Sequence, residues 1–357
     1  MLSATFHPVS NVSVIFCRRL FDENVGKRRM GKFTSLEICA GAGGQALGLE
    51  RAGFEHKCLV EIEDAACKTL LLNRPKWNVK RMDVHEFDAR SYRGIDLLAG
   101  GVPCPPFSIA GKQLGKDDER DLFPQALRLV SECAPKAVML ENVRGLLGDK
   151  FEAYRGHIQS ELKALGYVSE WRLAQASSFG VSQLRPRAIL IALRMEQWKF
   201  FRWPEVLTTP PRSIGELLVE NMGSGGWQGA IEWRKKANGI GPTLVGGSKK
   251  HGGADLGPTR ARKAWAVLGV DGRGLADSAP LPDHVGMPRL TLHMAALVQG
   301  FTPDWKFYGK KTAAYRQVGN AFPPPVAEAF GKAIIDALGH GQETRRRSKS
   351  EAEAVLS

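Results

Sequence analysis

From residue 34 onward the chain alternates short apolar runs with segments that carry apolar residues at helical spacing. Strands that alternate with helices are typical of βαβ units and of a parallel sheet. We therefore predict an α/β fold with a mostly parallel sheet. The pattern predicts strands at 34–39, 57–62, 95–101, 137–143, 167–175 and 187–194. It predicts helices at 45–53, around 122–133 and near 152–165, and a further helix that follows the second strand and ends near Asn73.

The pattern changes after about residue 197. Between 201 and 285 Gly, Pro and Trp are frequent, basic residues outnumber acidic ones, and periodicity is weak. Periodicity returns at 289–299, and a last helix is predicted at 324–338. The predicted organisation is an arm (1–32), a catalytic and cofactor-binding domain (33–196), an irregular basic insert (197–288), a return segment that completes the first domain (289–338) and a disordered tail (339–357).

The arm has two interpretations, because a second methionine, Met30, stands just before the first predicted strand. Either the arm is a flexible extension, or translation begins at Met30. Nothing in its residues resembles a secretory signal peptide, since the basic pair follows the apolar stretch.

Composition narrows the class of protein. The 357 residues are 43% hydrophobic and 24% charged, which excludes a chain that is disordered throughout. No apolar run approaches the roughly 18 residues of a membrane helix, so we expect a soluble protein without a membrane partner. The formal net charge of +13 favours a polyanionic partner.

The cysteines indicate a reducing compartment, the cytoplasm. None stands in a CxxC pair, so neither a zinc site nor any other metal site is predicted. For Cys58, Cys67 and Cys133, which stand on apolar segments, we expect buried and inert thiols.

A glycine-rich turn follows the first predicted strand. Gly41, Gly43 and Gly44 stand where the backbone can approach a nucleotide-like ligand at a helix N-terminus. Glu61 ends the second strand, where a carboxylate can accept hydrogen bonds from ribose hydroxyls. The pattern alone fits a dinucleotide enzyme, a methyltransferase or a plain tight turn.

Reactive side chains follow further predicted strands. Cys104 stands in GVPCPPFS directly after the strand at 95–101, and Glu141 ends an apolar strand. Arg185 and Arg187 stand at the start of the last predicted strand, where residues two apart point the same way. Because open α/β sheets bind ligands at the carboxyl ends of their strands, we expect a thiol, a carboxyl and a guanidinium at one edge.

Several segments, taken in order, resemble the successive motifs of the cytosine-5 DNA methyltransferases of bacterial restriction-modification type. The resemblance covers 34–195 and about 287–338, and the order of the motifs makes it specific. The segments are EICAGAGG, VEIED, PCPPFS, ENV, QLRPR, PRLTLHMAALVQGF and YRQVGNAFPPPVA. The resemblance implies a Rossmann-like domain that binds S-adenosylmethionine and a smaller DNA-recognition domain, here the insert.

The resemblance also implies roles for single residues. Cys104 matches the nucleophile, Glu141 the partner of cytosine N3, and Arg187 the arginine that contacts the cytosine, with Arg185 beside it. It implies methyl transfer to carbon 5 of a flipped-out cytosine in a specific duplex sequence through a covalent cysteine adduct. The implied cofactor contacts are Cys39, Gly41, Gly43, Gly44, Glu61 (ribose), Ile62, Asp83 (adenine amino group), Pro103 and Asn320.

The sequence departs from the family at Cys39, where a phenylalanine that packs on the adenine is common; cysteine offers less stacking.

The implied DNA contacts are Ser108 and Thr243, and the Gly-rich loop around Lys249 and Lys250 offers phosphate contacts. The expected partner is double-stranded DNA, bound by a monomer in a bacterial cytoplasm, at the nucleoid. The resemblance leaves room for a cognate restriction endonuclease encoded separately.

Four alternative functions explain the sequence less completely. A Rossmann dehydrogenase leaves PCPPFS, ENV and QLRPR unexplained. An amino-methyltransferase needs a good hydrogen-bond acceptor where Cys104 stands. A transfer-RNA methyltransferase of the same family does not account for the long basic insert. A DNA-binding regulator with a dead site does not account for the complete set of catalytic residues.

Overall fold

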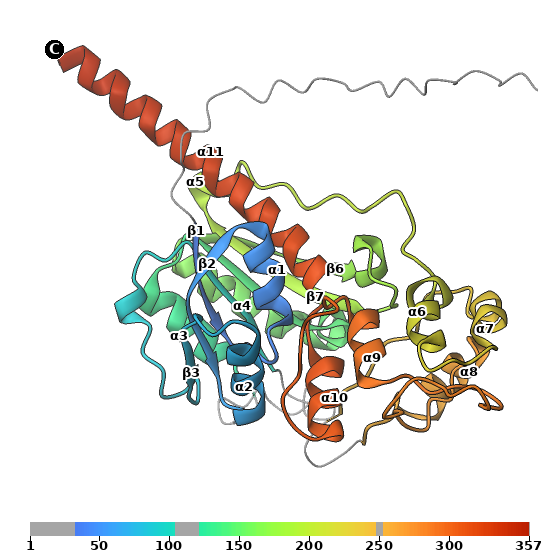
Figure 1. The fold of residues 1–357 in the computed structure, drawn as a ribbon. Helices are drawn as coiled ribbons and strands as arrows, with labels where there is room; N and C mark the ends of the chain where they lie inside the picture. Colours follow the sequence, from blue (N-terminus) through green and yellow to red (C-terminus); the bar gives the residue numbers. More distant parts are fainter. Residues whose placement is uncertain (1–32, 104–120, 248–252, 357) are drawn as a thin grey trace, which may run out of the picture. The chain divides into compact units, whose positions relative to one another are not determined.

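The computed structural model describes residues 33–103, 121–247 and 253–356, and side chains as far as residue 341. At its centre lies a seven-stranded sheet with the order β3-β2-β1-β4-β5-β7-β6 (Figure 1). The pairs from β3 to β5 are parallel, whereas β7 is antiparallel to both β5 and β6. The predicted α/β fold is confirmed. The strands are β1 (Phe33–Ile38), β2 (Phe54–Glu61), β3 (Val79–Arg81), β4 (Leu97–Gly101), β5 (Ala137–Val143), β6 (Tyr167–Gln175) and β7 (Pro186–Arg194).

Helices pack on both faces of the sheet. On one face, α3 and α4 enclose a buried cluster that includes Leu36, Ile38 and Phe123. On the other face, α1 and α11 bury Leu49 and Phe330 against the strands. These helices and α2 are α1 (Gly44–Ala52), α2 (Asp64–Asn73), α3 (Phe123–Cys133), α4 (Glu152–Ala164) and α11 (Pro324–Leu356).

The segment after β7 is more regular than its sequence suggests. Three helices form between 214 and 267, and they bury Leu218, Trp233 and Trp265 in one cluster with Met294 of α9. Helix α6 begins with a capping box between Ser213 and Glu216. The remaining helices are α5 (Met195–Trp198), α6 (Ile214–Gly223), α7 (Ala230–Lys236), α8 (Thr259–Val267), α9 (Leu292–Gln299) and α10 (Lys311–Asn320), with short 3-10 turns η1 (Arg90–Tyr92), η2 (Arg144–Leu147), η3 (Asp149–Phe151) and η4 (Ala176–Phe179).

The predicted elements of the α/β part are all present, and β5 has the predicted bounds. The last helix differs, because α11 continues from residue 338 to Leu356 where a disordered tail is predicted. The sequence there is rich in Ala, Glu, Arg and Lys, which propagate a helix readily.

Cys58, Cys67 and Cys133 are buried free thiols, as predicted. In the part of the chain that the structure describes, every helix is too short or too polar to cross a membrane.

Candidate active site

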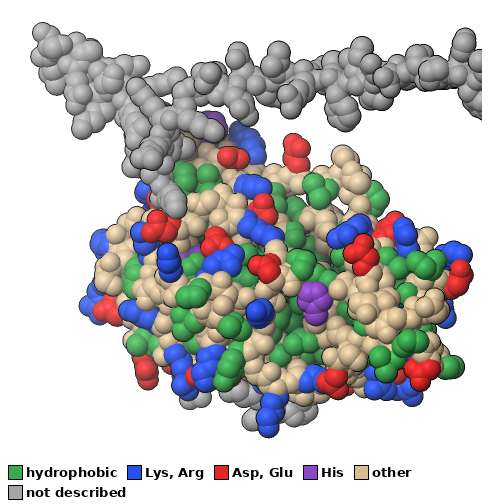
Figure 2. All heavy atoms as spheres, viewed as in Figure 1, with side chains coloured by type: hydrophobic (Ala, Val, Ile, Leu, Met, Phe, Trp, Pro, Cys, Tyr) green, Lys and Arg blue, Asp and Glu red, His purple; other side chains and the backbone are tan. Residues whose placement is uncertain are grey.

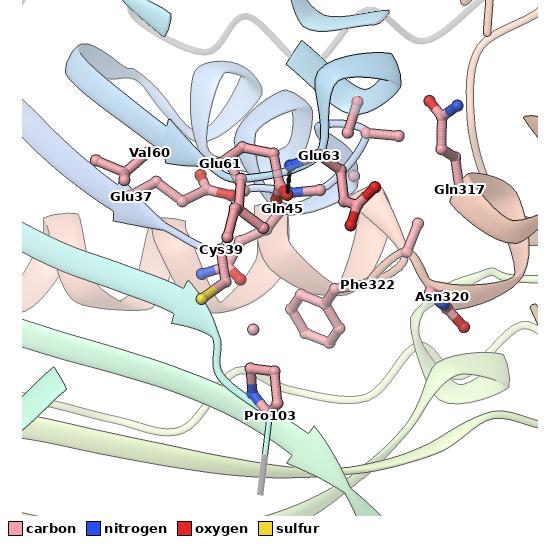
Figure 3. A pocket seen from close by; sticks show the side chains of 18 of the residues that line it. Glu37, Cys39, Gln45, Val60, Glu61, Glu63, Pro103, Gln317, Asn320 and Phe322 are labelled. Carbon is pink, nitrogen blue, oxygen red and sulfur yellow. Dashed lines mark hydrogen bonds between the residues drawn. The ribbon is translucent and has the colours of Figure 1, made fainter. Parts of the chain in front are cut away.

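A cavity of about 730 Å³ opens at the carboxyl edge of the sheet. Its wall is built from the ends of β1, β2, β4 and β5, from the turns that follow them, and from α10 with Ala321 and Phe322 that follow it (Figure 3). The lining includes most of the residues that the sequence singles out for a cofactor: Cys39, Gly41, Gly44, Glu61, Ile62, Asp83, Pro103 and Asn320, together with Glu141.

The glycine turn has a conformation that other residues rarely adopt. Gly41 and Gly43 have φ of 54° and 84°, in the left-handed region that favours glycine. At Gly44, the first residue of α1, a Cβ would collide with the carbonyl oxygen of Phe322. The turn therefore packs closely against the segment between α10 and α11, and the backbone of the α1 N-terminus borders the cavity.

The Glu61 carboxylate fixes this turn. Its Oε2 accepts a hydrogen bond from the Gly41 backbone N–H at 2.7 Å, and its Oε1 accepts one from the Glu63 N–H at 2.8 Å. Burial raises the pKa of Glu61, and these two backbone donors oppose the rise. The carboxylate is thus held in one position at the end of β2.

Asp83 follows β3, and His85 holds its carboxylate in position. The backbone N–H and Nδ1 of His85 contact Asp83 Oδ1 at 2.9 and 2.8 Å. These hydrogen bonds lower the pKa of Asp83, so it is ionised at neutral pH. Ile62, which also lines the cavity, is 55% exposed.

Cys39 follows β1 with a left-handed φ of 51° and lines the cavity. Burial, reinforced by the nearby Glu61 and Asp83 carboxylates, raises the pKa of its thiol, so Cys39 is a neutral thiol rather than a nucleophile.

Glu141, which lines the cavity, forms a buried ion pair with Arg187. Arg187 Nε lies 2.6 Å from Glu141 Oε1, and the two side chains are 12% and 11% exposed. The pair forms because β7 is antiparallel to β5: Arg187 lies opposite Val143, one diagonal step from Glu141. Burial raises the pKa of Glu141, and Arg187 followed by Arg185 lowers it.

Arg185 does not join Arg187 at Glu141, and neither arginine lines the cavity itself. It precedes β7, so the alternation of a strand does not apply to it. Its guanidinium is 1% exposed and donates hydrogen bonds to the carbonyl oxygens of Leu244 and Gly319, both at 2.8 Å. Arg185 therefore ties the insert and α10 to the sheet.

Segment 241–244 pairs with the turn before β7. Gly241 bridges Gln183, the Leu244 N–H donates to Gln183 Oε1 at 2.8 Å, and Thr243 Oγ1 donates to the Leu184 carbonyl oxygen. Asn320 Nδ2 donates to the carbonyl oxygen of Gly247 at 3.2 Å, at the rim of the cavity. Among the described residues, no cluster of His, Cys, Asp or Glu is suited to a metal ion.

A family model for C-5 cytosine-specific DNA methylases matches residues 33–336, which is most of the chain. The chain belongs to this family. It is therefore a DNA cytosine-5 methyltransferase, and the dehydrogenase and amino-methyltransferase alternatives are excluded.

The methylase has curated relatives among restriction-modification enzymes. It is 58% identical over 314 residues to the Type II methyltransferase M.NgoMIV of Neisseria gonorrhoeae, covering 86% of this chain and 98% of the relative. It is 55% identical over 320 residues to M.NaeI of Lentzea aerocolonigenes, covering 88% and 77%.

Solved structures share the fold of the methylase. The Entamoeba histolytica methyltransferase EhMeth superposes with a TM-score of 0.63 at 15% identity, covering 87% of this chain and 99% of the other. A Spodoptera frugiperda DNMT2 mutant superposes with a TM-score of 0.61 at 18% identity, covering 85% and 99%.

Four predicted residues of the methylase lie outside the described residues: Cys104, Ser108, Lys249 and Lys250. Sequence reasoning missed other residues that line the cavity, namely Glu37, Gln45, His85, Arg316 and Phe322. The position of Gln45 directly after the glycine turn is the one indication that the sequence carried.

Proposed function

We propose that this methylase transfers a methyl group from S-adenosylmethionine to carbon 5 of a flipped-out cytosine, through a covalent bond between Cys104 and carbon 6. The observation that carries the proposal is the Glu141–Arg187 pair, which lies at the edge of the same cavity as Pro103, the residue before Cys104. Membership of the family supports it.

The residues of the cavity fit the proposed methyl donor. Glu61 and Asp83 offer carboxylate oxygens to the ribose hydroxyls and the adenine amino group, and the glycine turn leaves room for the ligand. The smaller Cys39 leaves the adenine with less stacking area than a phenylalanine would. S-adenosylmethionine supplies an electrophilic methyl group when it is bound.

The protein residues then have separate tasks. The Cys104 thiolate adds to carbon 6 of the cytosine, which makes carbon 5 nucleophilic. Glu141 holds a proton at N3, so that the ring accepts the thiolate more easily. Arg187 stabilises the charge that develops at O2. Carbon 5 then takes the methyl group, and S-adenosylhomocysteine is the leaving group. Removal of the carbon 5 proton finally expels the Cys104 sulfur as thiolate and frees the methylated cytosine.

The environment of Glu141 supports its task. Burial favours the neutral carboxyl, while the Arg187 guanidinium at 2.6 Å favours the carboxylate. Burial outweighs the arginines, so the pKa of Glu141 is raised above its ordinary value, which favours a carboxyl that holds a proton.

We further propose that residues 197–288 form the target-recognition domain. Thr243 lies at the junction with the turn before β7, and Lys249 and Lys250 follow in the sequence as candidate phosphate contacts. Since the target atom is inaccessible in a duplex, the base must leave the stack. The Type II names of the relatives favour a role beside a restriction endonuclease.

The test uses duplex DNA with 5-fluorocytosine at the target position. Thiol addition and methyl transfer can proceed, but fluorine cannot leave as a proton does, so the protein should stay covalently attached to DNA only when S-adenosylmethionine is present. A denaturing gel detects the adduct, and peptide mapping should assign it to Cys104. Absence of an adduct on DNA that the active protein methylates would overturn the proposal.

A further inference from the structure

An exposed arginine of the insert is held on a buried carboxylate. The Arg273 side chain is 73% exposed, whereas that of Asp271, which follows α8, is 11% exposed. Asp271 Oδ1 accepts hydrogen bonds from the Arg273 backbone N–H at 3.1 Å and from its Nε at 2.9 Å, and Oδ2 accepts one from its Nη2 at 3.2 Å. A second arginine, Arg289, donates from Nε to the same Oδ2 at 2.9 Å. Guanidinium groups therefore occupy both oxygens of the carboxylate.

This geometry leaves one edge of the Arg273 guanidinium open. Its Nε and Nη2 face Asp271, so the edge formed by Nη1 and Nη2 points away from the carboxylate. Nη1 has no hydrogen-bond partner among the described residues, and Arg273 borders an open cavity of about 680 Å³. The two N–H groups of the open edge form a planar fork that can donate to two neighbouring acceptors at once.

The carboxylate fixes the direction of this fork. A surface arginine ordinarily loses rotamer freedom when it binds a ligand, and that loss weakens binding. The hydrogen bonds from Arg273, followed by those from Arg289, hold the pKa of Asp271 well below its usual range, although partial burial opposes them. Asp271 is therefore ionised at neutral pH and keeps the Arg273 guanidinium in one orientation before any ligand is bound.

The cluster of Asp271, Arg273 and Arg289 lies beside a proposed DNA contact. Two backbone hydrogen bonds of 3.0 and 2.9 Å join residues 272–275 to residues 254–256, which follow Lys249 and Lys250 closely in the sequence. Arg273 also has a glycine on each side, so neighbouring side chains do not keep its backbone away from a ligand. These features favour DNA as the ligand of the open edge.

The charges of the cluster favour a base over a phosphate. Lys and Arg side chains are spread over the face shown in Figure 2, with Asp and Glu among them, so charge alone marks no DNA contact there. Asp271 neutralises one of its two arginines, and Asp283 lines the same cavity. A phosphate contact needs positive charge, whereas base reading needs donors in a fixed orientation. In the major groove, guanine presents N7 and O6 side by side to such a fork.

We propose that Arg273 recognises a guanine of the target sequence through N7 and O6, an inference that rests on the proposed role of residues 197–288 in DNA recognition. Asp271 is the positioning residue, because it holds the guanidinium while the open edge contacts the base. Arg289 supports the carboxylate from its other side.

The first experiment measures base preference with the full chain. A pool of duplexes with randomised bases is methylated and then read by bisulfite sequencing. Arg273→Ala should lose the preference for guanine at one position by about 10- to 100-fold, and the other positions should keep theirs. Asp271→Asn should weaken the preference at the same position. The double variant should lose no more than Arg273→Ala, because both residues act on one contact.

The second experiment changes the DNA instead of the protein. In 7-deazaguanine a carbon replaces N7, while Watson–Crick pairing is kept. Each guanine of the methylated sequence is replaced in turn, and duplex binding is measured by competition in a gel-shift assay. At one position the replacement should weaken binding of the wild type by about tenfold. The same replacement should change binding of Arg273→Ala by less than about twofold.

Arg90→Ala is the matched control. Arg90 also donates from its backbone N–H and Nε to the aspartate two residues before it, Asp88, at 2.9 and 3.1 Å, and its side chain is 75% exposed. It belongs to η1 in the catalytic domain. Arg90→Ala should leave the methylated sequence and the response to 7-deazaguanine unchanged.

Three results would overturn the assignment while the wild type still methylates its sequence. One is an Arg273→Ala variant with unchanged base preference. Another is an equal loss for all sequences with a salt slope lower by about 1, which would make Arg273 a phosphate contact. The third is a wild type that tolerates 7-deazaguanine at every position. A wild type that methylates no cytosine in any duplex would instead overturn the proposed function.

Discussion

Replacing Arg187 by methionine should destabilise the protein in a pH-dependent way. The substitution keeps the unbranched apolar stem of the side chain but leaves the Glu141 carboxyl, 11% exposed, without the guanidinium 2.6 Å away. Loss of one partner of a buried ion pair costs about 3–5 kcal/mol, because the remaining charge is uncompensated. We expect a loss of about this size in the free energy of unfolding at pH 7.

The pH dependence follows from the pKa of Glu141. That pKa is already raised by burial in the wild type, and removal of Arg187 raises it further. A group whose pKa is raised on folding stabilises the fold at low pH and loses that effect as the pH rises. Below the wild-type pKa the carboxyl is neutral in both proteins, so the difference between them is smallest. Above it, the difference should grow by up to about 1.4 kcal/mol per pH unit.

Urea unfolding at several pH values between about 4.5 and 7 measures this difference. In the double variant Arg187→Met with Glu141→Gln, most of the pH dependence of this difference should disappear, because residue 141 no longer carries a titrating carboxyl. Lys235→Met is the exposed counterpart, since Lys235 and Glu232 are 68% and 74% exposed, and it should cost less than about 1 kcal/mol. An Arg187→Met deficit that is equal at every pH would refute the reasoning.

Three further predictions concern other parts of the chain. Cys104→Ser should abolish methyl transfer and leave duplex binding nearly unchanged in a gel-shift assay, since phosphate contacts elsewhere supply most of the affinity; turnover above about a hundredth of the wild-type rate would exclude Cys104 as nucleophile. Replacing Lys249 and Lys250 by alanine should reduce the salt slope of DNA binding by about 2, whereas an unchanged slope would mean that neither lysine contacts a phosphate. Gly44→Ala should lower both the melting temperature and the affinity for S-adenosylhomocysteine, because its Cβ would collide with the Phe322 carbonyl oxygen; a stable variant with normal affinity would show that the segment between α10 and α11 can move aside.

The sequence predicted the α/β part well because its apolar pattern follows burial there. Strand β5 has the predicted bounds, since it is buried along most of its length. Helix α8 was missed because Trp265 is its only buried residue, so no apolar stripe marks it. The short edge strand β3 has no buried residue, so no apolar pattern in the sequence predicts it.

The candidate site was likewise predictable in part. The meeting of Glu141 and Arg187 at one edge was predictable, because it depends on where strands end and begin. The separate direction of Arg185 was not, because it depends on tertiary contacts with Leu244 and Gly319. The position of Gln45 in the cavity wall was not predictable, because a glutamine after a glycine turn is common on surfaces. Its burial depends on how α1 packs.

Under the proposed role of the insert in DNA recognition, its junction with the sheet bears on how new DNA specificities arise. Gln183 and Arg185 hold Leu244 only through its backbone N–H and C=O groups. No polar side chain of the insert is required for these two hydrogen bonds. Apart from Thr243, whose hydroxyl donates to the Leu184 carbonyl oxygen, the insert can therefore change its surface residues without loosening this attachment. A recognition module exchanged between relatives should thus stay anchored, provided that it presents an apolar residue with the same backbone path at position 244.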